Sequence, residues 1–209
     1  MMKSRLMAAA RADSIPEGSA GLWYIRRDTF EKKMLVTHCG KVKGIEPGTY
    51  TRLHCYTDST LHNQGECVMT DDPQELVTHL DFMLRAKGDV LIVGLGLGCV
   101  IRGCLANPNV RSVTCIEKSR DVLKLVQPHM PKDRLTIIHA DALVWCEQTD
   151  LKYDCAWTDI WTDTDRGEDH LAVAHQNIMI SLIDKVGFQG AWQFPRYVRR
   201  ILRNHGRFI

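Results

Sequence analysis

Three glycines in the middle of the chain have the spacing of a nucleotide-binding turn. The apolar run Val90-Leu-Ile-Val leads directly into Gly94-Leu95-Gly96-Leu-Gly98. Glycine permits a tight turn and lets a ligand approach the main chain. A helix that begins after such a turn presents free N–H groups and the positive end of its dipole. We therefore predict that residues 94–98 bind a nucleotide.

Acidic residues follow the next two strands that the sequence predicts. Glu117, with Lys118 beside it, comes at the end of the second strand, where a carboxylate can accept hydrogen bonds from both ribose hydroxyls. Asp141 and Ala142 follow the third strand and are placed to recognise an adenine amino group. Because ligands bind outside the carboxyl ends of strands in an open sheet, these residues should converge on one nucleoside.

The spacing also discriminates between nucleotides. The dinucleotide pattern G-x-G-x-x-G requires a sixth-position glycine, which is Cys99 here, and a phosphate-binding loop ending in Lys-Ser/Thr is missing from the sequence. We therefore expect S-adenosylmethionine, or its decarboxylated form, in preference to NAD.

The elements that must position these residues alternate between strand and helix. Continuous apolar runs are typical of buried parallel strands, and short links between strand and helix favour right-handed crossovers. The prediction is a Rossmann-like, mostly parallel α/β sheet. Its strands are expected at residues 89–93, 112–116, 135–139 and 153–158, and its helices at 98–106, 119–126, 142–148 and 166–184.

Residues 1–71 show short candidate strands separated by turn residues in place of alternating strands and helices, and they are expected to form a small antiparallel β element. After a short helix over 3–12, turn residues separate candidate strands at 21–27, 34–39, 50–56 and 66–70. Asp71-Asp72-Pro73 is then a start signal for a helix that continues to about Ala86. The expected divisions are 1–71, a nucleotide-binding domain at 72–184 and a basic C-terminal tail at 185–209.

Composition favours an ordinary globular protein. Charged residues make up 25% of the chain and the net charge is +2, which is too small to indicate nucleic acid or membrane by itself. The eight cysteines form no Cys-x-x-Cys pair, and several lie in apolar runs, so we expect free thiols in a cytoplasmic protein. Neighbouring His and Cys residues on a strand point to opposite faces, so no metal site is expected.

The basic tail mixes arginines with aromatic residues and leaves two interpretations open. It could contact nucleic acid, or it could pack a helix on the sheet with its charged side in solvent, which is the interpretation we favour. The sequence does not settle the oligomeric state and leaves a homo-oligomer open.

The stretch from about Asp71 to Asp163 resembles the spermidine-synthase-like branch of the class I S-adenosylmethionine-dependent transferases. Its strongest part is Val90 to Val122, with the glycine turn and Glu117. The resemblance implies that the glycines line the methionine–sulfonium side, Glu117 holds the ribose and Asp141 lies at the adenine. It also implies an acceptor-side role for Asp159, which follows the fourth strand. Trp161 could form a wall of the acceptor pocket, and we expect it and Asp163 beside the substrate.

The sequence departs from that branch at several points. Aminopropyltransferases have an aspartate where this chain has Leu97, another where it has Ser119, and Asp-Ser-Ser-Asp-Pro where it has Asp159-Ile-Trp-Thr-Asp163. The antiparallel strand pair that usually closes the sheet is not evident, so the sheet is expected to be curtailed at its C-terminal edge. These departures favour a methyltransferase with an unknown acceptor. The alternatives are an aminopropyltransferase and a non-catalytic binding or assembly protein that retains the fold.

Asp159 is the candidate catalytic residue. Transfer from a sulfonium mainly requires that the enzyme position the nucleophile and exclude water. An amine or hydroxyl acceptor must lose a proton, and a carboxylate at the end of the fourth strand could accept it. If the acidic residues around it line the pocket, they favour a small-molecule acceptor that carries an amine; the alternative is that they belong to a solvated loop and the start of a helix. Alternatively, Asp159 caps the following helix.

Overall fold

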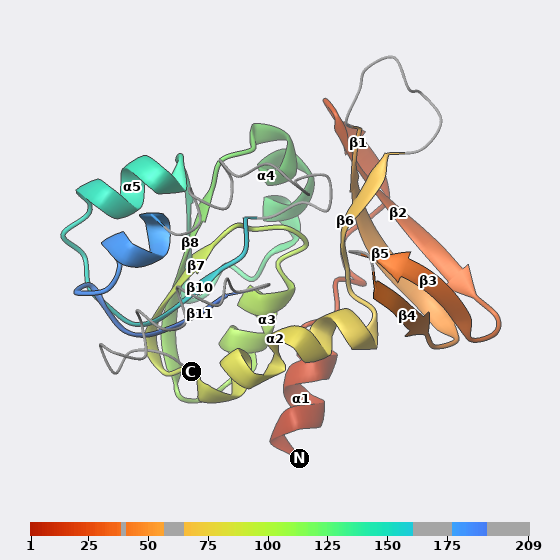
Figure 1. The fold of residues 1–209 in the computed structure, drawn as a ribbon, viewed down its shortest axis with the longest axis horizontal. Coiled ribbons are helices and arrows are strands. Elements are labelled where there is room, and N and C mark those ends of the chain that lie inside the picture. Colours follow the sequence, from red (N-terminus) through yellow and green to blue (C-terminus); the bar gives the residue numbers. More distant parts are fainter. Residues whose placement is uncertain (39–40, 57–64, 161–176, 192–209) are drawn as a thin grey trace.

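The computed structural model describes residues 1–38, 41–56, 65–160 and 177–191. An antiparallel β element lies beside a parallel sheet that is covered by helices (Figure 1). This arrangement confirms the predicted Rossmann-like α/β class with an N-terminal antiparallel element.

The N-terminal part begins with α1 (Met2–Ala9) and continues into a four-stranded sheet in the order β1-β2-β5-β6. A separate hairpin is made by β3 and β4. The sequence did not predict β1 or β4, because β1 has three residues and β4 contains two lysines and a glycine. The strand bounds are Gly18–Ala20 (β1), Trp23–Phe30 (β2), Met34–His38 (β3), Lys41–Ile45 (β4), Gly48–Cys55 (β5) and Glu66–Thr70 (β6).

Helix α2 (Pro73–Arg85) connects the two parts and begins where the sequence predicts. The Asp72 side chain accepts hydrogen bonds from the N–H groups of Gln74 and Glu75, at 2.8 and 3.1 Å, and thereby satisfies two donors that the first turn leaves free. The buried face of the helix includes Leu76, Leu80 and Met83, but also Glu75 and His79.

Within the described residues, the parallel sheet has five strands in the order β11-β10-β7-β8-β9. Its bounds are Gly88–Val93 (β7), Val110–Glu117 (β8), Leu135–His139 (β9), Tyr153–Thr158 (β10) and Val186–Ala191 (β11). The crossovers contain α3 (Cys99–Ala106), α4 (Arg120–Val126) with a 3₁₀ turn at Gln127–His129, and α5 (Ala142–Gln148). Every strand pair in this sheet is parallel, as the sequence predicts.

Strand β11 lies in the segment that the sequence analysis assigned to the tail, where it expected no strand. The segment Val186-Gly-Phe-Gln-Gly-Ala191 contains two glycines, which weaken the local strand signal. This segment is a strand because it pairs in parallel with β10, from Tyr153 to Thr158, and not because of its local sequence. Of the helix expected at 166–184, residues 177–184 are described: 177–181 are helical and 182–184 form a turn. Trp161, Asp163 and the basic segment 192–209 lie outside the described residues.

The hydrophobic core lies on both faces of the parallel sheet. One cluster joins Ile92, Cys155 and Trp157 to apolar residues of α1, α2, α3 and α4. The other joins Leu91 and Ala156 to α5 and to the helix at 177–181. The seven cysteines of the described residues are free, and five of them are buried.

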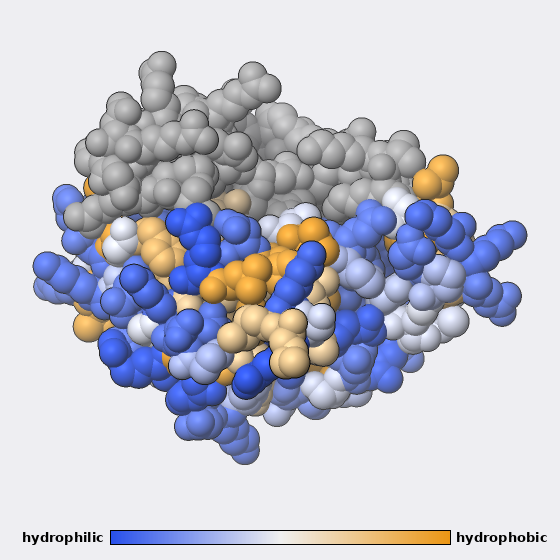
Figure 2. All heavy atoms as spheres, turned by 90° about the horizontal axis from the view of Figure 1, so that it is seen from below, coloured by the Kyte–Doolittle hydropathy of each residue, from blue (hydrophilic) through white to orange (hydrophobic). Residues whose placement is uncertain are grey.

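The outer face of the helices α1 and α2 is partly apolar. Met2, Val77 and Leu84 on these helices are exposed, and apolar side chains gather in the middle of the face seen from below in Figure 2. No helix among the described residues has both the length and the apolar character to cross a membrane.

Candidate functional site

The glycine turn joins β7 to α3 at the carboxyl edge of the sheet. The backbone φ angles of Gly94, Gly96 and Gly98 are +97°, +50° and +74°. Residues that carry a side chain rarely adopt such positive values. A Cβ at Gly94 would lie 2.1 Å from the carbonyl oxygen of Asp159, and one at Gly96 would lie 2.5 Å from Sδ of Met69. The glycines predicted for close approach of a ligand are therefore also required by the protein's own packing.

Glu117, at the end of β8, is fixed next to this turn. Its Oε2 accepts a hydrogen bond from the N–H of Leu95 at 2.8 Å, and its Oε1 accepts one from the N–H of Ser119 at 2.6 Å. These two donors orient the carboxylate. Each oxygen keeps capacity for a further hydrogen bond, because an ionised carboxylate offers about four acceptor positions.

Asp141 lies between β9 and α5 and has two partners. It accepts a hydrogen bond from the N–H of Leu143 at 2.9 Å, which caps α5, and its Oδ2 lies 2.7 Å from Nζ of Lys118. The hydrogen bond from Lys118 is the main reason that the pKa of Asp141 is lowered. Ala142, the next residue, is buried.

These residues surround a cavity of about 440 Å³, which we call the nucleoside pocket. Its size falls in the range of small-molecule sites in proteins. Trp23, Leu53 and Val68 of the N-terminal sheet contribute to one wall. Of the residues predicted from the sequence, the lining includes Gly94, Gly96, Glu117, Lys118, Asp141, Ala142 and Asp159. Leu95 and Gly98 are not part of this lining.

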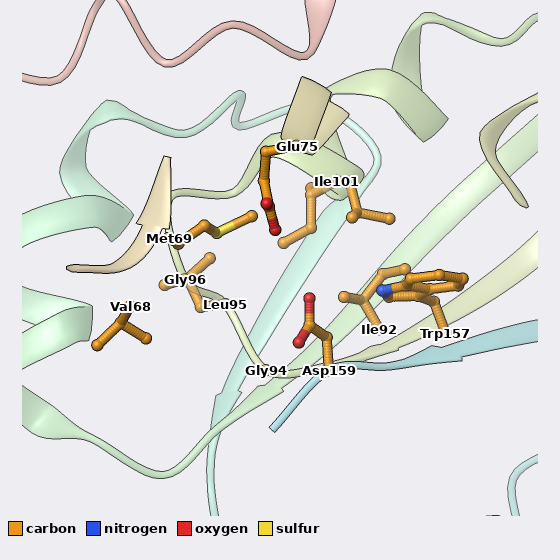
Figure 3. Close-up of a pocket in the computed structure, with 11 residues that line it drawn as sticks. Val68, Met69, Glu75, Ile92, Gly94, Leu95, Gly96, Ile101, Trp157 and Asp159 are labelled. Carbon is orange, nitrogen blue, oxygen red and sulfur yellow. The ribbon is translucent and has the colours of Figure 1, made fainter. Parts of the chain in front are cut away.

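A smaller cavity of about 50 Å³, which we call the acidic recess, adjoins the nucleoside pocket. Val68, Gly94, Gly96 and Asp159 line both cavities. The carboxylates of Glu75 and Asp159 point toward one another across the recess, and Trp157 borders it on one side (Figure 3). The other lining residues are Met69, Ile92, Leu95, Val100 and Ile101.

Asp159 follows β10, and its N–H donates to the carbonyl of Val93 at 2.9 Å. Burial raises the pKa of its carboxyl to about 7, and the negative charge of Glu75 acts in the same direction. The indole N–H of Trp157 has the opposite, smaller effect on that pKa. Protein carboxyls with a pKa near neutrality can accept and return a proton at physiological pH.

Glu75 is a member of the site that the sequence did not predict. In the sequence it is only an acid near the start of a helix. The available signal was its position: Glu75, His79 and Phe82 are spaced i, i+4 and i+7, so they lie on one face of α2, and that face is buried. An acid on an apolar helix face is uncommon unless it is partnered.

Leu97, which stands where the resembled branch has an acid, is fully buried in the core. Its N–H donates to Sδ of Met69 at 3.2 Å. Neither cavity lining includes Leu97 among the described residues.

Comparison with known proteins gives one curated relative and a group of similar folds. No protein-family model matches the chain. The polyamine aminopropyltransferase of Ruegeria sp. (strain TM1040) is 24% identical over 160 residues, which is 68% of this chain and 55% of the relative. The chain thus spans about half the length of the curated relative that it matches.

Among the solved structures with a similar fold, two spermidine synthases match most of the chain. Spermidine synthase from Thermotoga maritima has a TM-score of 0.52 at 15% identity, over 88% of this chain and 57% of that chain. A spermidine synthase in complex with the transition-state analogue AdoDATO has a TM-score of 0.56 at 16% identity, over 92% and 64% of the two chains. These similarities confirm, at the level of the fold, the resemblance that the sequence indicates.

Proposed function

We propose that this protein is a transferase that moves an aminopropyl group from decarboxylated S-adenosylmethionine to an amine. The observation that carries the proposal is the acidic recess next to the nucleoside pocket. It contains Glu75 and Asp159, and no lysine or arginine is present among its described lining residues. The similarity to a polyamine aminopropyltransferase supports the same assignment.

The nucleoside pocket fits the adenosine part of such a donor. Glu117 is held by two N–H groups with acceptor capacity to spare for ribose hydroxyls. Asp141 and Ala142 line the same pocket for the adenine. The glycine turn brings main-chain atoms of Gly94 and Gly96 to the boundary between the pocket and the recess.

The charge of the recess favours the decarboxylated donor. A carboxylate there would face the acids Glu75 and Asp159, and like charges at close range are costly when water is largely excluded. An ammonium group would be attracted by both. The charge of the recess thus supports our proposal of aminopropyl transfer over the methyl transfer expected from the sequence, even though the residue at position 97 is a leucine and not an acid.

When bound, the donor supplies a carbon activated by positively charged sulfur. The amine nitrogen forms the new C–N bond while the electron pair of the C–S bond passes to sulfur, which leaves a neutral thioether nucleoside. The nitrogen must give up a proton, and Asp159 lies where the two cavities meet and can accept it. Its raised pKa, about 7, suits that role.

The proposal is tested by calorimetric titration with decarboxylated S-adenosylmethionine, S-adenosylmethionine, S-adenosylhomocysteine and NAD. We expect the decarboxylated donor to bind most tightly, and its binding to weaken by roughly 100-fold in Glu117→Ala, since hydrogen bonds to a charged group are lost. Glu147→Ala, on the exposed side of α5, is the matched control. Tighter binding of S-adenosylmethionine would return the assignment to a methyltransferase. Binding of none of the four ligands would contradict the proposal.

Binding and catalysis need separate measurements, because a protein that retains the fold without catalysis would also bind the donor. We expect release of methylthioadenosine when the donor is mixed with diamines. Tight donor binding without this product, over a panel of amines, would instead support a non-catalytic binding protein.

A further inference from the structure

The nucleoside pocket has one basic side chain in its described lining. Among the described residues that line the pocket, Lys118 is the only lysine or arginine. It follows β8, and its carbonyl accepts a hydrogen bond from Nε2 of His139 at 3.1 Å. His139 is the last residue of β9, which pairs with β8. The main chain of Lys118 is therefore fixed between two neighbouring strand ends of the sheet.

The side chain of Lys118 forms an ion pair inside the same lining. Its Nζ lies 2.7 Å from Oδ2 of Asp141, which also borders the pocket. The other carboxylate oxygen of Asp141 accepts a hydrogen bond from the N–H of Leu143 at 2.9 Å. The adjacent acid, Glu117, is held by two main-chain N–H groups. The charge of Lys118 is thus directed to Asp141, the residue that we assign to the adenine.

The ion pair keeps both a donor and an acceptor for a ligand. An ammonium group has three N–H donors, of which one is directed to Asp141, and each carboxylate oxygen offers about two acceptor positions. Lys118 and Asp141 therefore present a donor and an acceptor side by side, with 2.7 Å between the two atoms. The side-chain amide of Asn or Gln has the same combination, and it pairs with adenine through the amino group and the ring nitrogen N7.

Adenine is complementary to such a pair, whereas a 6-oxo purine is not. The exocyclic amino group of adenine donates, and the ring nitrogens N1 and N7 on either side of it accept. Guanine presents a carbonyl oxygen in place of the amino group, and this second acceptor would face the carboxylate of Asp141. The pKa of Asp141 is lowered, chiefly by its hydrogen bond from Lys118, so the carboxylate stays available as an ionised acceptor.

We propose that Lys118 is a specificity-determining residue that donates a hydrogen bond to a ring nitrogen of adenine, next to the amino group that Asp141 accepts. The inference rests on the proposed function, because it requires that the pocket bind the nucleoside of the donor. Two side chains from neighbouring strand ends thus act together as one amide side chain does elsewhere. Since Lys118 is 76% exposed, the ion pair by itself contributes little to folding, and its main role is recognition.

Calorimetry with three nucleosides tests this inference. The probes are 5′-methylthioadenosine and its 1-deaza and 7-deaza forms, in which C–H replaces one ring nitrogen. In the unaltered protein we expect one deaza form to bind roughly 5- to 20-fold more weakly, since it loses a hydrogen bond to an exposed charged group. Lys118→Met should bind methylthioadenosine with a similar loss. It should show no further loss with that deaza form, because the same hydrogen bond has been removed from its other side.

Lys118→Arg keeps the charge and the donors and should recover part of the lost affinity. The matched control is Lys124→Met, which removes the same charge from an exposed position of α4, and it should behave like the unaltered protein. Equal weakening of all three nucleosides in Lys118→Met would show that Lys118 only holds Asp141, and would overturn the inference. Unchanged affinities in that variant would overturn it as well, and both results leave the proposed function intact. Failure of the unaltered protein to bind any of the three nucleosides would overturn both.

Discussion

Asp141 and Asp159 each follow a strand of the same parallel sheet, but their surroundings give them opposite properties. Asp141 is partly exposed and held by Lys118, so its pKa is lowered and it stays ionised. Asp159 loses solvation in the acidic recess and also faces Glu75 there, so its pKa is raised to about 7. The same residue type therefore supplies a fixed charge in the nucleoside pocket and, in the proposed function, a proton acceptor in the recess. The environment, more than the residue type, determines what each carboxyl can do.

The largest expected effect comes from Gly94→Ala, because Gly94 borders both cavities. The new Cβ would lie 2.1 Å from the carbonyl oxygen of Asp159, and main chain cannot move aside cheaply. We expect the free energy of unfolding to fall by roughly 3 kcal/mol or more, with loss of methylthioadenosine binding. Urea denaturation and calorimetry measure the two effects.

Gly18→Ala is the control for this change. A Cβ at Gly18 would meet only Cδ2 of Leu125, at 3.7 Å, which is an ordinary contact. If both variants were equally stable, the packing argument for the glycine turn would be wrong.

The next largest effect separates the two aspartates by function. Asp159→Asn should lower the rate of transfer by roughly 100-fold or more, since it removes the proton acceptor, while methylthioadenosine binding is retained. Asp141→Asn should weaken methylthioadenosine binding and leave the rate at saturating donor nearly unchanged. Steady-state kinetics together with calorimetry decide between these patterns. Equal losses of rate in the two variants would remove the functional distinction.

The contributions of Asp159 and Asp141 to stability should change with pH in opposite directions. Because the pKa of Asp159 is raised from 3.8 to about 7, the unfolded chain loses this proton first. The contribution of Asp159 to stability is thus fully present below pH about 4 and is lost as the pH rises toward about 7. Urea denaturation across this pH range should show that the free energy of unfolding falls less with rising pH in Asp159→Asn than in the unaltered protein. An unchanged profile would contradict the raised pKa.

The smallest effect is expected for the ion pair of Asp141. Its lowered pKa contributes stability above the ordinary value of 3.8, and this contribution is lost as the pH falls through the lower, folded value. Lys118 is 76% exposed, so Lys118→Met should cost below about 1 kcal/mol, and less in high salt. Denaturation of the variant at low and high ionic strength measures this. A salt-independent loss of several kcal/mol would show that Lys118 has a packing role.

Much of the parallel sheet could be predicted from local sequence. The bounds of β9, α5 and β10 agree with the prediction, because compact apolar runs and an aspartate cap mark them clearly. Strand β11 could not be predicted, since its two glycines weaken the apolar strand pattern and the segment depends on pairing with β10. Residues 1–71 gave the right class of element but not β1 or β4, which depend on pairing with other strands.

The sequence by itself placed the glycine turn, Glu117 and Asp141 at one edge of the sheet, because strand ends in a parallel sheet meet there. It also identified Asp159 as a candidate. Only the tertiary structure placed Glu75 opposite Asp159, since the two residues are far apart in the chain and come from different layers. Whether a carboxyl faces a second carboxyl or is held by a lysine depends on how those layers pack, and this packing sets its charge.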